Sequence, residues 1–186
     1  MERVVQMHDD VLRLRRLVDD LGALAEADAA LAGPSIAVER CDLAEIAGNA
    51  ADSLRPVAEA GQQRVVRQLE PAIVDGDPAR LAQIVTNLLT NAIKFTPAEG
   101  EVTLNVGRNI SEHTATLTVS DDGPGIAPDD RAHIFERFYR GESTRPVAGS
   151  GVGLAVVAQL VKAHGGTVEL VDTPVGTTIR ATFPSA

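Results

Sequence analysis

The chain has 186 residues, of which 44% are apolar, so it is long enough to bury the core of one or two small domains. Its 26 acidic and 17 basic residues give a net charge of -9, which argues against binding to the phosphate backbone of a nucleic acid. Only Lys94 and Lys162 are lysines, and neither follows a glycine, which excludes a Walker-type phosphate loop.

Cysteine, apolar and aromatic content disfavour further classes of protein. The single cysteine, Cys41, cannot form an internal disulfide or a multi-cysteine metal site, so we expect a core position for it in a reducing compartment. No apolar run approaches the roughly 18 residues of a membrane span, and the first residues lack the layout of a signal peptide. Aromatic residues make up 3% of the chain, too few for a platform that stacks nucleic-acid bases. The chain as given is expected to be soluble and globular.

The first part of the chain predicts one long amphipathic helix. Apolar residues recur at alternating spacings of three and four from Val4 to Ala25, and Gly33-Pro34 ends the pattern. A second apolar stripe runs from Val5 to Leu31, and one helix cannot bury both stripes by itself. We therefore expect this helix, residues 1–33, to join a helical bundle between chains; a surface helix packed on its own domain is the alternative.

From residue 35 onward, strand-like and helix-like patterns alternate, which favours a second domain over residues 34–186. Asp77-Pro78 is typical of an N-cap followed by the first helical residue, and residues 109–112 are expected to turn between antiparallel strands. This mixed order predicts an α+β two-layer sandwich with a mixed sheet and helices on one face. We expect strands over residues 36–38, 64–69, 72–75, 101–106, 114–120, 167–171 and 177–183, and helices over 43–60, 78–95, 128–138 and 151–164.

The helix expected over residues 78–95 carries a polar stripe. Asn87, Asn91 and Lys94 recur at i, i+4 and i+7, away from the apolar face of the helix. Amide oxygens are suitable ligands for Mg²⁺, and a lysine one turn further on can reach phosphate oxygens. Asparagine is also common on exposed helical faces, so a solvated surface remains the alternative.

Acids and glycines follow the strand expected over residues 114–120. Asp121 ends the strand, and Gly123, Gly125 and Ile126 come shortly after it. A carboxylate fixed at a strand end can accept a hydrogen bond from an exocyclic amine, and glycines let a flat ring approach the backbone. A tight turn, with the aspartate as its cap, is the alternative.

A second glycine-rich segment, Gly149-Ser150-Gly151-Val152-Gly153-Leu154, opens the helix expected over residues 151–164. Such a loop offers N–H groups and the positive end of a helix dipole to phosphates, although it lacks the GxGxxG spacing of dinucleotide-binding proteins. Before it lies Ile134-Phe135-Glu136-Arg137-Phe138-Tyr139-Arg140, followed by a polar loop over residues 141–148. That arrangement is typical of a lid. The alternative for the glycine-rich segment is a helix cap, and the alternative for the lid is the end of an amphipathic helix followed by a variable loop.

In this order and spacing, the four segments resemble the boxes of the catalytic ATP-binding domain of sensor histidine kinases. This domain has the Bergerat fold of the GHKL proteins, which is shared with gyrase, the heat-shock chaperone of 90 kDa and mismatch-repair ATPases. The resemblance covers about residues 35–184. The opening helix is similar to the second helix of the family's dimerisation domain.

The resemblance implies that the domain binds ATP and Mg²⁺. At the base, Asp121 would receive the adenine amino group, with Thr178 near the ring. At the phosphates, Asn91 would hold Mg²⁺, Asn87 would support the metal or the phosphates, and Lys94 would contact phosphate oxygens. The remaining expected cofactor-binding residues are Phe95, Gly123, Gly125, Ile126, Gly149, Ser150, Gly151, Val152, Gly153 and Leu154.

Two positions bear on the implied reaction. Arg140, or less favourably Arg137, would stabilise charge on the transferring γ-phosphoryl group. The related ATPases have a water-activating glutamate at the position of Asn87, and an amide cannot act as a general base at neutral pH. The resemblance therefore implies phosphoryl transfer to a protein, with Asn87, Lys94 and Arg140 as catalytic residues, rather than hydrolysis.

The histidine that accepts the phosphoryl group in this family is not found. His8 precedes Asp9, but no proline follows and only one helix separates it from Gly33-Pro34, so a solvated His8 is favoured. The other histidines are expected to be structural or exposed. Either the chain is part of a longer sensor kinase or a separate chain carries the acceptor.

The resemblance also implies partners and a location. The partners are a His-bearing dimerisation domain, a response regulator and a second copy through the N-terminal helix, and nucleic acid is not among them. The location is cytoplasmic, with any membrane anchor carried by the full-length protein. Two other functions stay open, an anti-sigma-type serine kinase of the same fold and a nucleotide-binding regulatory module without transfer activity. The lid segment and the heptad helix count against the first, and the intact Asn91, Asp121 and Lys94 count against the second.

Overall fold

The computed structural model describes residues 37–141 and 151–186. The amphipathic helix expected over residues 1–33, together with Gly149 and Ser150, lies outside the described residues. No helix in the described part of the chain is long and apolar enough to cross a membrane. In chain order the elements are β1 (Glu39–Asp42), α2 (Leu43–Ala60), β2 (Arg64–Leu69), β3 (Ile73–Gly76), α3 (Pro78–Phe95), β4 (Glu101–Asn109), β5 (Thr114–Asp121), α4 (Gly153–Ala163), β6 (Thr167–Val171) and β7 (Thr177–Pro184).

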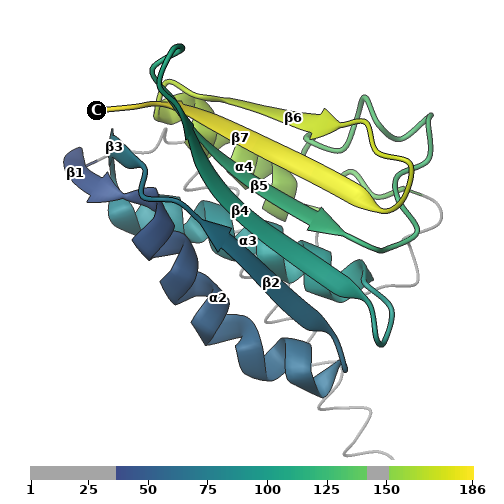
Figure 1. Ribbon diagram of the computed structural model, residues 1–186. Helices are drawn as coiled ribbons and strands as arrows, with labels where there is room; N and C mark the ends of the chain where they lie inside the picture. Colours follow the sequence, from purple (N-terminus) through teal and green to yellow (C-terminus); the bar gives the residue numbers. More distant parts are fainter. Residues whose placement is uncertain (1–36, 142–150) are drawn as a thin grey trace, which may run out of the picture.

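Five strands form the main sheet in the order β2-β4-β5-β7-β6, and the helices cover one of its faces (Figure 1). β2 runs parallel to β4, whereas the other neighbouring strands are antiparallel. The predicted α+β two-layer sandwich with a mixed sheet is therefore confirmed. β1 and β3 depart from that prediction, because they pair with each other in a separate two-stranded sheet.

Aspartate caps begin α2 and α3. Asp77 Oδ1 accepts hydrogen bonds from the next two free N–H groups of α3 at 3.0 and 3.1 Å, and Pro78 needs no partner at the first helical position. Asp42 Oδ1 accepts from the N–H of Ala44 at 2.9 Å and of Ala72 at 3.0 Å. The first cap fixes the start of α3, and the second also ties α2 to the segment before β3.

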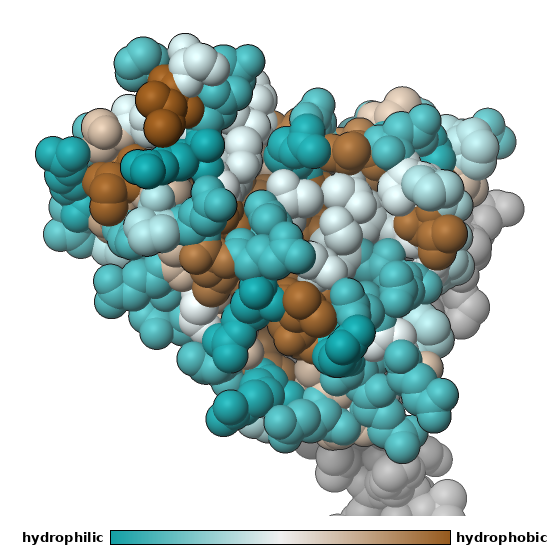
Figure 2. Space-filling view, viewed as in Figure 1, coloured by the Kyte–Doolittle hydropathy of each residue, from teal (hydrophilic) through white to brown (hydrophobic). Residues whose placement is uncertain are grey.

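The core lies between the helices and the inner face of the sheet. Residues of β4, β5 and β7 alternate, with apolar side chains inward and mostly Thr, Ser and Asn outward. Seen from the side of Figure 1, the surface is mostly teal and white, with brown in separate patches (Figure 2). The most deeply buried large side chains are Phe183, Leu43, Leu81, Ile84, Leu88, Leu89, Leu104, Leu117, Val74, Val85, Val102 and Val106. Because α3 contributes five of these, its other face is left to carry polar side chains.

Two expected elements were wrong. Residues 128–138 form consecutive turns, with N–H groups bonded to carbonyls three residues earlier, rather than a helix. The N–H of Phe138 bonds instead to the carbonyl of Gly151 at 3.0 Å, and Phe138 has a φ of 62°, which takes the chain off a helical path. The first strand, expected over residues 36–38, begins at Glu39, because its pairing with β3 starts opposite Gly76.

Candidate functional site

A pocket of about 340 Å³ lies where the four sequence segments meet. Its walls come from α3, from the loop after β5, from residues 134–141 and from the start of α4. These segments are separated by tens of residues in the sequence, and the fold brings them around one cavity. The volume is suitable for a small organic ligand.

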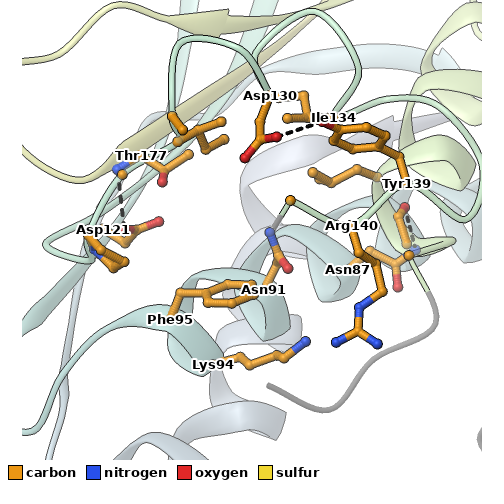
Figure 3. Close-up of a pocket in the computed structure, with 18 of the residues that line it drawn as sticks. Asn87, Asn91, Lys94, Phe95, Asp121, Asp130, Ile134, Tyr139, Arg140 and Thr177 are labelled. Atoms are coloured by element: carbon orange, nitrogen blue, oxygen red, sulfur yellow. Dashed lines mark hydrogen bonds between the residues drawn. The ribbon is translucent and has the colours of Figure 1, made fainter. Parts of the chain in front are cut away.

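α3 lines the pocket with the predicted polar stripe (Figure 3). Asn87, Asn91 and Lys94 all line it, and Phe95 follows, with its ring centroid 4.7 Å from Lys94 Nζ. Asn87 Nδ2 donates to the carbonyl of Gly153 at 3.5 Å, which links α3 to the start of α4. The stripe predicted from helical spacing therefore faces a cavity instead of bulk solvent.

Asp121 is fixed at one end of the pocket. Its Oδ1 accepts hydrogen bonds from the N–H of Gly123 at 2.8 Å and the N–H of Thr177 at 3.2 Å. Burial raises the pKa of the Asp121 carboxyl above its ordinary value of 3.8, while these hydrogen bonds oppose part of the rise. A carboxylate can accept more than two hydrogen bonds, so Asp121 can also receive a donor from a ligand.

Glycines bring three segments into contact around Asp121. A Cβ on Gly176, whose φ is 71°, would lie 1.6 Å from the carbonyl oxygen of Asp121. A Cβ on Gly123 would lie 2.9 Å from the carbonyl oxygen of Phe95. Gly125 lines the pocket, whereas Gly123 is buried beside α3, so these glycines set the spacing of the walls as well as the space for a ligand.

Two cations lie at the other end of the pocket. Figure 3 shows the side chains of Lys94 and Arg140 reaching into the same region, away from Asp121. Burial lowers the pKa of Lys94 below its ordinary 10.5, and the charge of Arg140 lowers it further. An anion bound between the two cations would offset this repulsion, so this end is suited to phosphate groups.

Four of the predicted site residues that the structure describes do not line the pocket: Gly123, which is buried beside α3, and Thr178, Arg137 and Val152. The side chain of Thr178 points to the outer face of the sheet, where its hydroxyl donates to Ser120 Oγ at 3.0 Å, and Thr177 lines the pocket instead. One residue along a strand reverses the face, which explains the error. Arg137 donates to Gln159 Oε1 at 3.0 Å outside the pocket, and Val152 is buried in the core.

Of the remaining residues predicted from the two glycine-rich segments, some line the pocket and others lie outside the described residues. Gly151, Gly153 and Leu154 line the pocket, as does Ile126 from the first glycine segment. Gly149 and Ser150 lie outside the described residues. The arrangement thus puts the described start of α4 against the pocket.

Several lining residues were missed by the site prediction from sequence. Thr90 lies three residues after Asn87 on the same helical face, so extending the polar stripe would have found it. Tyr139 is the only tyrosine of the chain and directly precedes Arg140, which was a usable signal. Asp130 had no such signal, because its contact with Tyr139 joins residues that a helix over 128–138 would have kept apart.

The donor set is compatible with a metal that arrives with a ligand. Among the described residues, no group of three or more His, Cys, Asp or Glu side chains could hold a metal ion. Asn87 and Asn91 offer neutral oxygens, and Mg²⁺ is commonly held by one or two protein oxygens together with phosphates and waters. The residues present therefore fit Mg²⁺ bound between a polyphosphate and α3.

The histidines of the described residues stay outside the pocket. His164 donates from Nδ1 to the carbonyl of Leu160 at 2.7 Å, and its Nε2 accepts from the N–H of Asp77 at 3.1 Å. His133 contacts Glu136 on the surface at 2.8 Å. His8 lies outside the described residues.

Residues 76–186 match the family described as histidine kinase-, DNA gyrase B- and HSP90-like ATPase. The chain belongs to this family. In the solved structure of the "Mycobacterial sensor histidine kinase MprB", 97% of that chain aligns with 80% of this one at 33% identity and a TM-score of 0.68. The domain is therefore an ATP-binding domain of the sensor histidine kinase type.

Longer members of the family are also similar. A "Signal transduction histidine-protein kinase/phosphatase MprB" of Mycobacterium ulcerans (strain Agy99) is 35% identical over 98% of this chain and 36% of its own length. Its namesake in Mycolicibacterium vanbaalenii is 38% identical over 95% of this chain and 38% of its own length. Full-length ShkA in complex with AMPPNP aligns over 97% of this chain and 39% of its own, at 28% identity and a TM-score of 0.79. The chain thus spans well under half of these relatives.

Proposed function

We propose that this domain binds Mg-ATP and transfers the γ-phosphoryl group to a histidine of a dimerisation domain, for relay to an aspartate of a response regulator. The observation that carries the proposal is the polarity of the pocket, with the Asp121 carboxylate at one end and Lys94 and Arg140 at the other. An adenine nucleotide has the complementary polarity, with an amine donor at the base and negative charge at the phosphates.

At the base end, Asp121 would accept a hydrogen bond from the adenine amino group. The backbone N–H groups of Gly123 and Thr177 hold the carboxylate in place before the ligand arrives, so little reorganisation is needed. Phe95 and Ile126 offer apolar surface to the ring. ShkA, a relative of similar fold, was solved with the ATP analogue AMPPNP, which supports the assignment of the nucleotide.

At the phosphate end, the domain's cations would act on the group that is transferred. In the transfer, the bond between the γ-phosphorus and the bridging oxygen breaks, a bond from phosphorus to an imidazole nitrogen forms, and ADP leaves with the bond electrons. Lys94 would hold phosphate oxygens and Arg140 would stabilise charge on the γ-phosphoryl group. Asn91 and Asn87 would hold Mg²⁺, which would supply charge neutralisation between the phosphates.

The amide at position 87 favours transfer over hydrolysis. Asn87 lines the pocket beside Asn91, one helical turn away, and an amide cannot take a proton from water at neutral pH. With no histidine of the described residues in the pocket, the acceptor is proposed to come from a dimerisation domain of a longer protein or a separate chain. We propose that the reaction takes place in the cytoplasm, where ATP is available.

The test is phosphoryl transfer in vitro. The 186-residue chain is incubated with γ-labelled ATP, Mg²⁺ and a separately produced His-bearing dimerisation domain, and the label is followed on the second protein. We expect an acid-labile phosphoprotein. An acid-stable label on serine would favour the serine kinase, and tight ATP binding without any transfer would favour the regulatory module.

Two arginine variants decide which cation serves the reaction. Arg140→Gln is expected to lower the transfer rate about 100-fold, because a preorganised cation on the γ-phosphoryl group is lost. Arg137→Gln is expected to change the rate less than about twofold, since Arg137 contacts Gln159 away from the pocket. The reverse outcome would assign the role to Arg137.

A further inference from the structure

Arg140 lies in a segment that is neither helix nor strand. Residues 134–138 form turns and residues 139–141 have no regular structure, yet they contribute Ile134, Tyr139, Arg140 and Gly141 to the pocket. A cation that acts on a transferring group must be held in a defined place, because a misplacement of 1 Å can cost about 100-fold in rate. The contacts that hold this segment are therefore part of the site.

A side-chain hydrogen bond ties the segment to the loop after β5. Tyr139 donates its hydroxyl proton to Asp130 Oδ1 at 2.6 Å, and Figure 3 shows this bond spanning the side of the pocket opposite Lys94. Both residues line the pocket. The ring of Tyr139 also lies 5.3 Å from that of His133, measured between centroids. The bond is short, and it joins the residue immediately before Arg140 to the start of the same run of turns, nine residues back.

The segment also lies close to two other parts of the chain. A Cβ on Gly151 would lie 2.7 Å from the carbonyl oxygen of Tyr139, and a Cβ on Gly141 would lie 2.3 Å from Asp130 Oδ2. Phe138 has a φ of 62°, a backbone conformation that residues other than glycine rarely adopt. Surrounding contacts must therefore maintain it. The backbone from Phe138 to Gly141 thus lies close to both Gly151 and Asp130.

We propose that the Tyr139–Asp130 hydrogen bond is a positioning contact that fixes Arg140 at the phosphate end of the pocket. The proposal rests on the function proposed above for Arg140. Tyr139 itself does not act on the phosphoryl group; it sets the direction in which the next side chain leaves the backbone. Without the bond, the segment would sample other turns and Arg140 would spend less time beside Lys94.

The existence of the contact can be measured without any activity. The chain has one tyrosine and no tryptophan, so phenolate absorbance near 295 nm reports Tyr139 alone. The bond to Asp130 raises the pKa of Tyr139 above its ordinary 10.0, with smaller contributions from burial and from the charges of Asp130, Glu136 and Asp129. In Asp130→Ala the phenol should titrate at lower pH than in the parent, with circular dichroism at each pH confirming that both remain folded. An unchanged titration would overturn the proposal.

The effect on Arg140 is tested with Tyr139→Phe, which removes one oxygen and keeps the ring. We expect the transfer rate at saturating ATP to fall about tenfold or more, and the affinity for ADP, measured by calorimetry, to change less than about twofold, because ADP lacks the γ-phosphoryl group. Asp130→Ala should match it, and Asp130→Asn, which keeps an acceptor oxygen, should recover part of the rate. Tyr139→Phe should have no further effect in an Arg140→Gln background.

Other outcomes separate failure of the contact from failure of the function. Equal losses of ADP and ATP affinity in Tyr139→Phe would mean that the hydroxyl binds the nucleotide directly, and additive effects with Arg140→Gln would mean that the two residues act independently; either result overturns the positioning role. Absence of transfer by the parent protein would overturn the proposed function, and the tyrosine titration would still report whether the contact exists.

Discussion

Two of the walls that enclose the pocket are built in different ways. The regular wall consists of α3 and the facing ends of β5 and β7, and it carries Asn91, Lys94 and Asp121 on helix and strand. The turn wall consists of residues 124–141, where bonds between residues three apart replace regular structure. It carries Tyr139 and Arg140.

The difference separates binding from transfer. The groups proposed to hold the base and the metal lie on elements whose places are fixed by a buried core, which is suited to a ligand that must bind in one pose. The group proposed to act on the γ-phosphoryl lies on a wall held by a few side-chain contacts. Changes to the regular wall should therefore affect stability and affinity, and changes to the turn wall should mainly affect rate.

The largest effect is expected at the tight junction of the regular wall. Gly176→Ala places a Cβ 1.6 Å from the carbonyl oxygen of Asp121 at a φ of 71°, so β7 and the end of β5 must separate. We expect a loss of about 3 kcal/mol or more in the free energy of unfolding and loss of ATP binding, measured by denaturant titration and calorimetry.

Gly153→Ala is the matched control for this substitution. Its Cβ would meet nothing within 4 Å, and Gly153 begins α4 without a positive φ. Its stability should be unchanged or raised by up to about 1 kcal/mol. If Gly176→Ala were as stable as this control, β7 would not press on Asp121.

The next effect concerns the base end. Asp121→Asn keeps an oxygen for the N–H groups of Gly123 and Thr177 but can turn an NH₂ group toward the adenine amine, so two donors meet. We expect an affinity for ATP about 100-fold lower by calorimetry, as for a lost hydrogen bond to a charged group. An affinity within a few fold of the parent would mean that Asp121 does not receive the base.

The same variant has a pH signature in the ligand-free protein. Because burial raises the pKa of Asp121 above 3.8, the folded protein binds this proton more tightly than the unfolded chain does. The parent therefore loses stability at this site as the pH rises from the unfolded pKa through the folded one, and Asp121→Asn does not. The melting temperature of the variant minus that of the parent should increase as the pH rises through this range, and the difference should then stay constant at higher pH.

Lys94→Met tests the phosphate end of the regular wall. Burial and Arg140 lower the pKa of Lys94 below 10.5, so the charge of Lys94 costs stability as the pH falls from the unfolded pKa through the folded one. At neutral pH the ligand-free variant should be at least as stable as the parent. Its affinity for ATP should fall about tenfold, since Arg140 remains, and a drop in stability without a drop in affinity would contradict the assignment.

The two walls also differ in what the sequence could predict. α3 was predicted with its residues correct, because Asp77-Pro78 marks its start and Asn87, Asn91 and Lys94 follow helical spacing apart from the buried face. The ends of β5 and β7 were predicted within one residue. Local patterns were sufficient wherever one face of an element is buried against the core.

The turn wall could not be predicted in the same way. Ile134, Phe135 and Phe138 have a spacing compatible with a helix, and only contacts with distant residues, such as Phe138 with Gly151, select turns. The contact between Tyr139 and Asp130 likewise depends on the path between them. Such pairings carry no periodic signal in one sequence.

The smallest effect is expected at Thr178, the residue that the resemblance implied near the adenine, whereas its neighbour Thr177 lines the pocket. Thr178 is paired with Ser120, Thr177 is paired with Asp121, and side chains on a strand alternate between faces. Thr178→Val should therefore change the affinity for ATP less than about twofold, because it alters only the hydroxyl contact on the outer face. A large loss of affinity would mean that a side chain on the outer face of the sheet influences nucleotide binding, or that β7 shifts its register by one residue on binding. Calorimetry on this conservative variant thus tests whether the regular wall is rigid enough to fix which threonine meets the base.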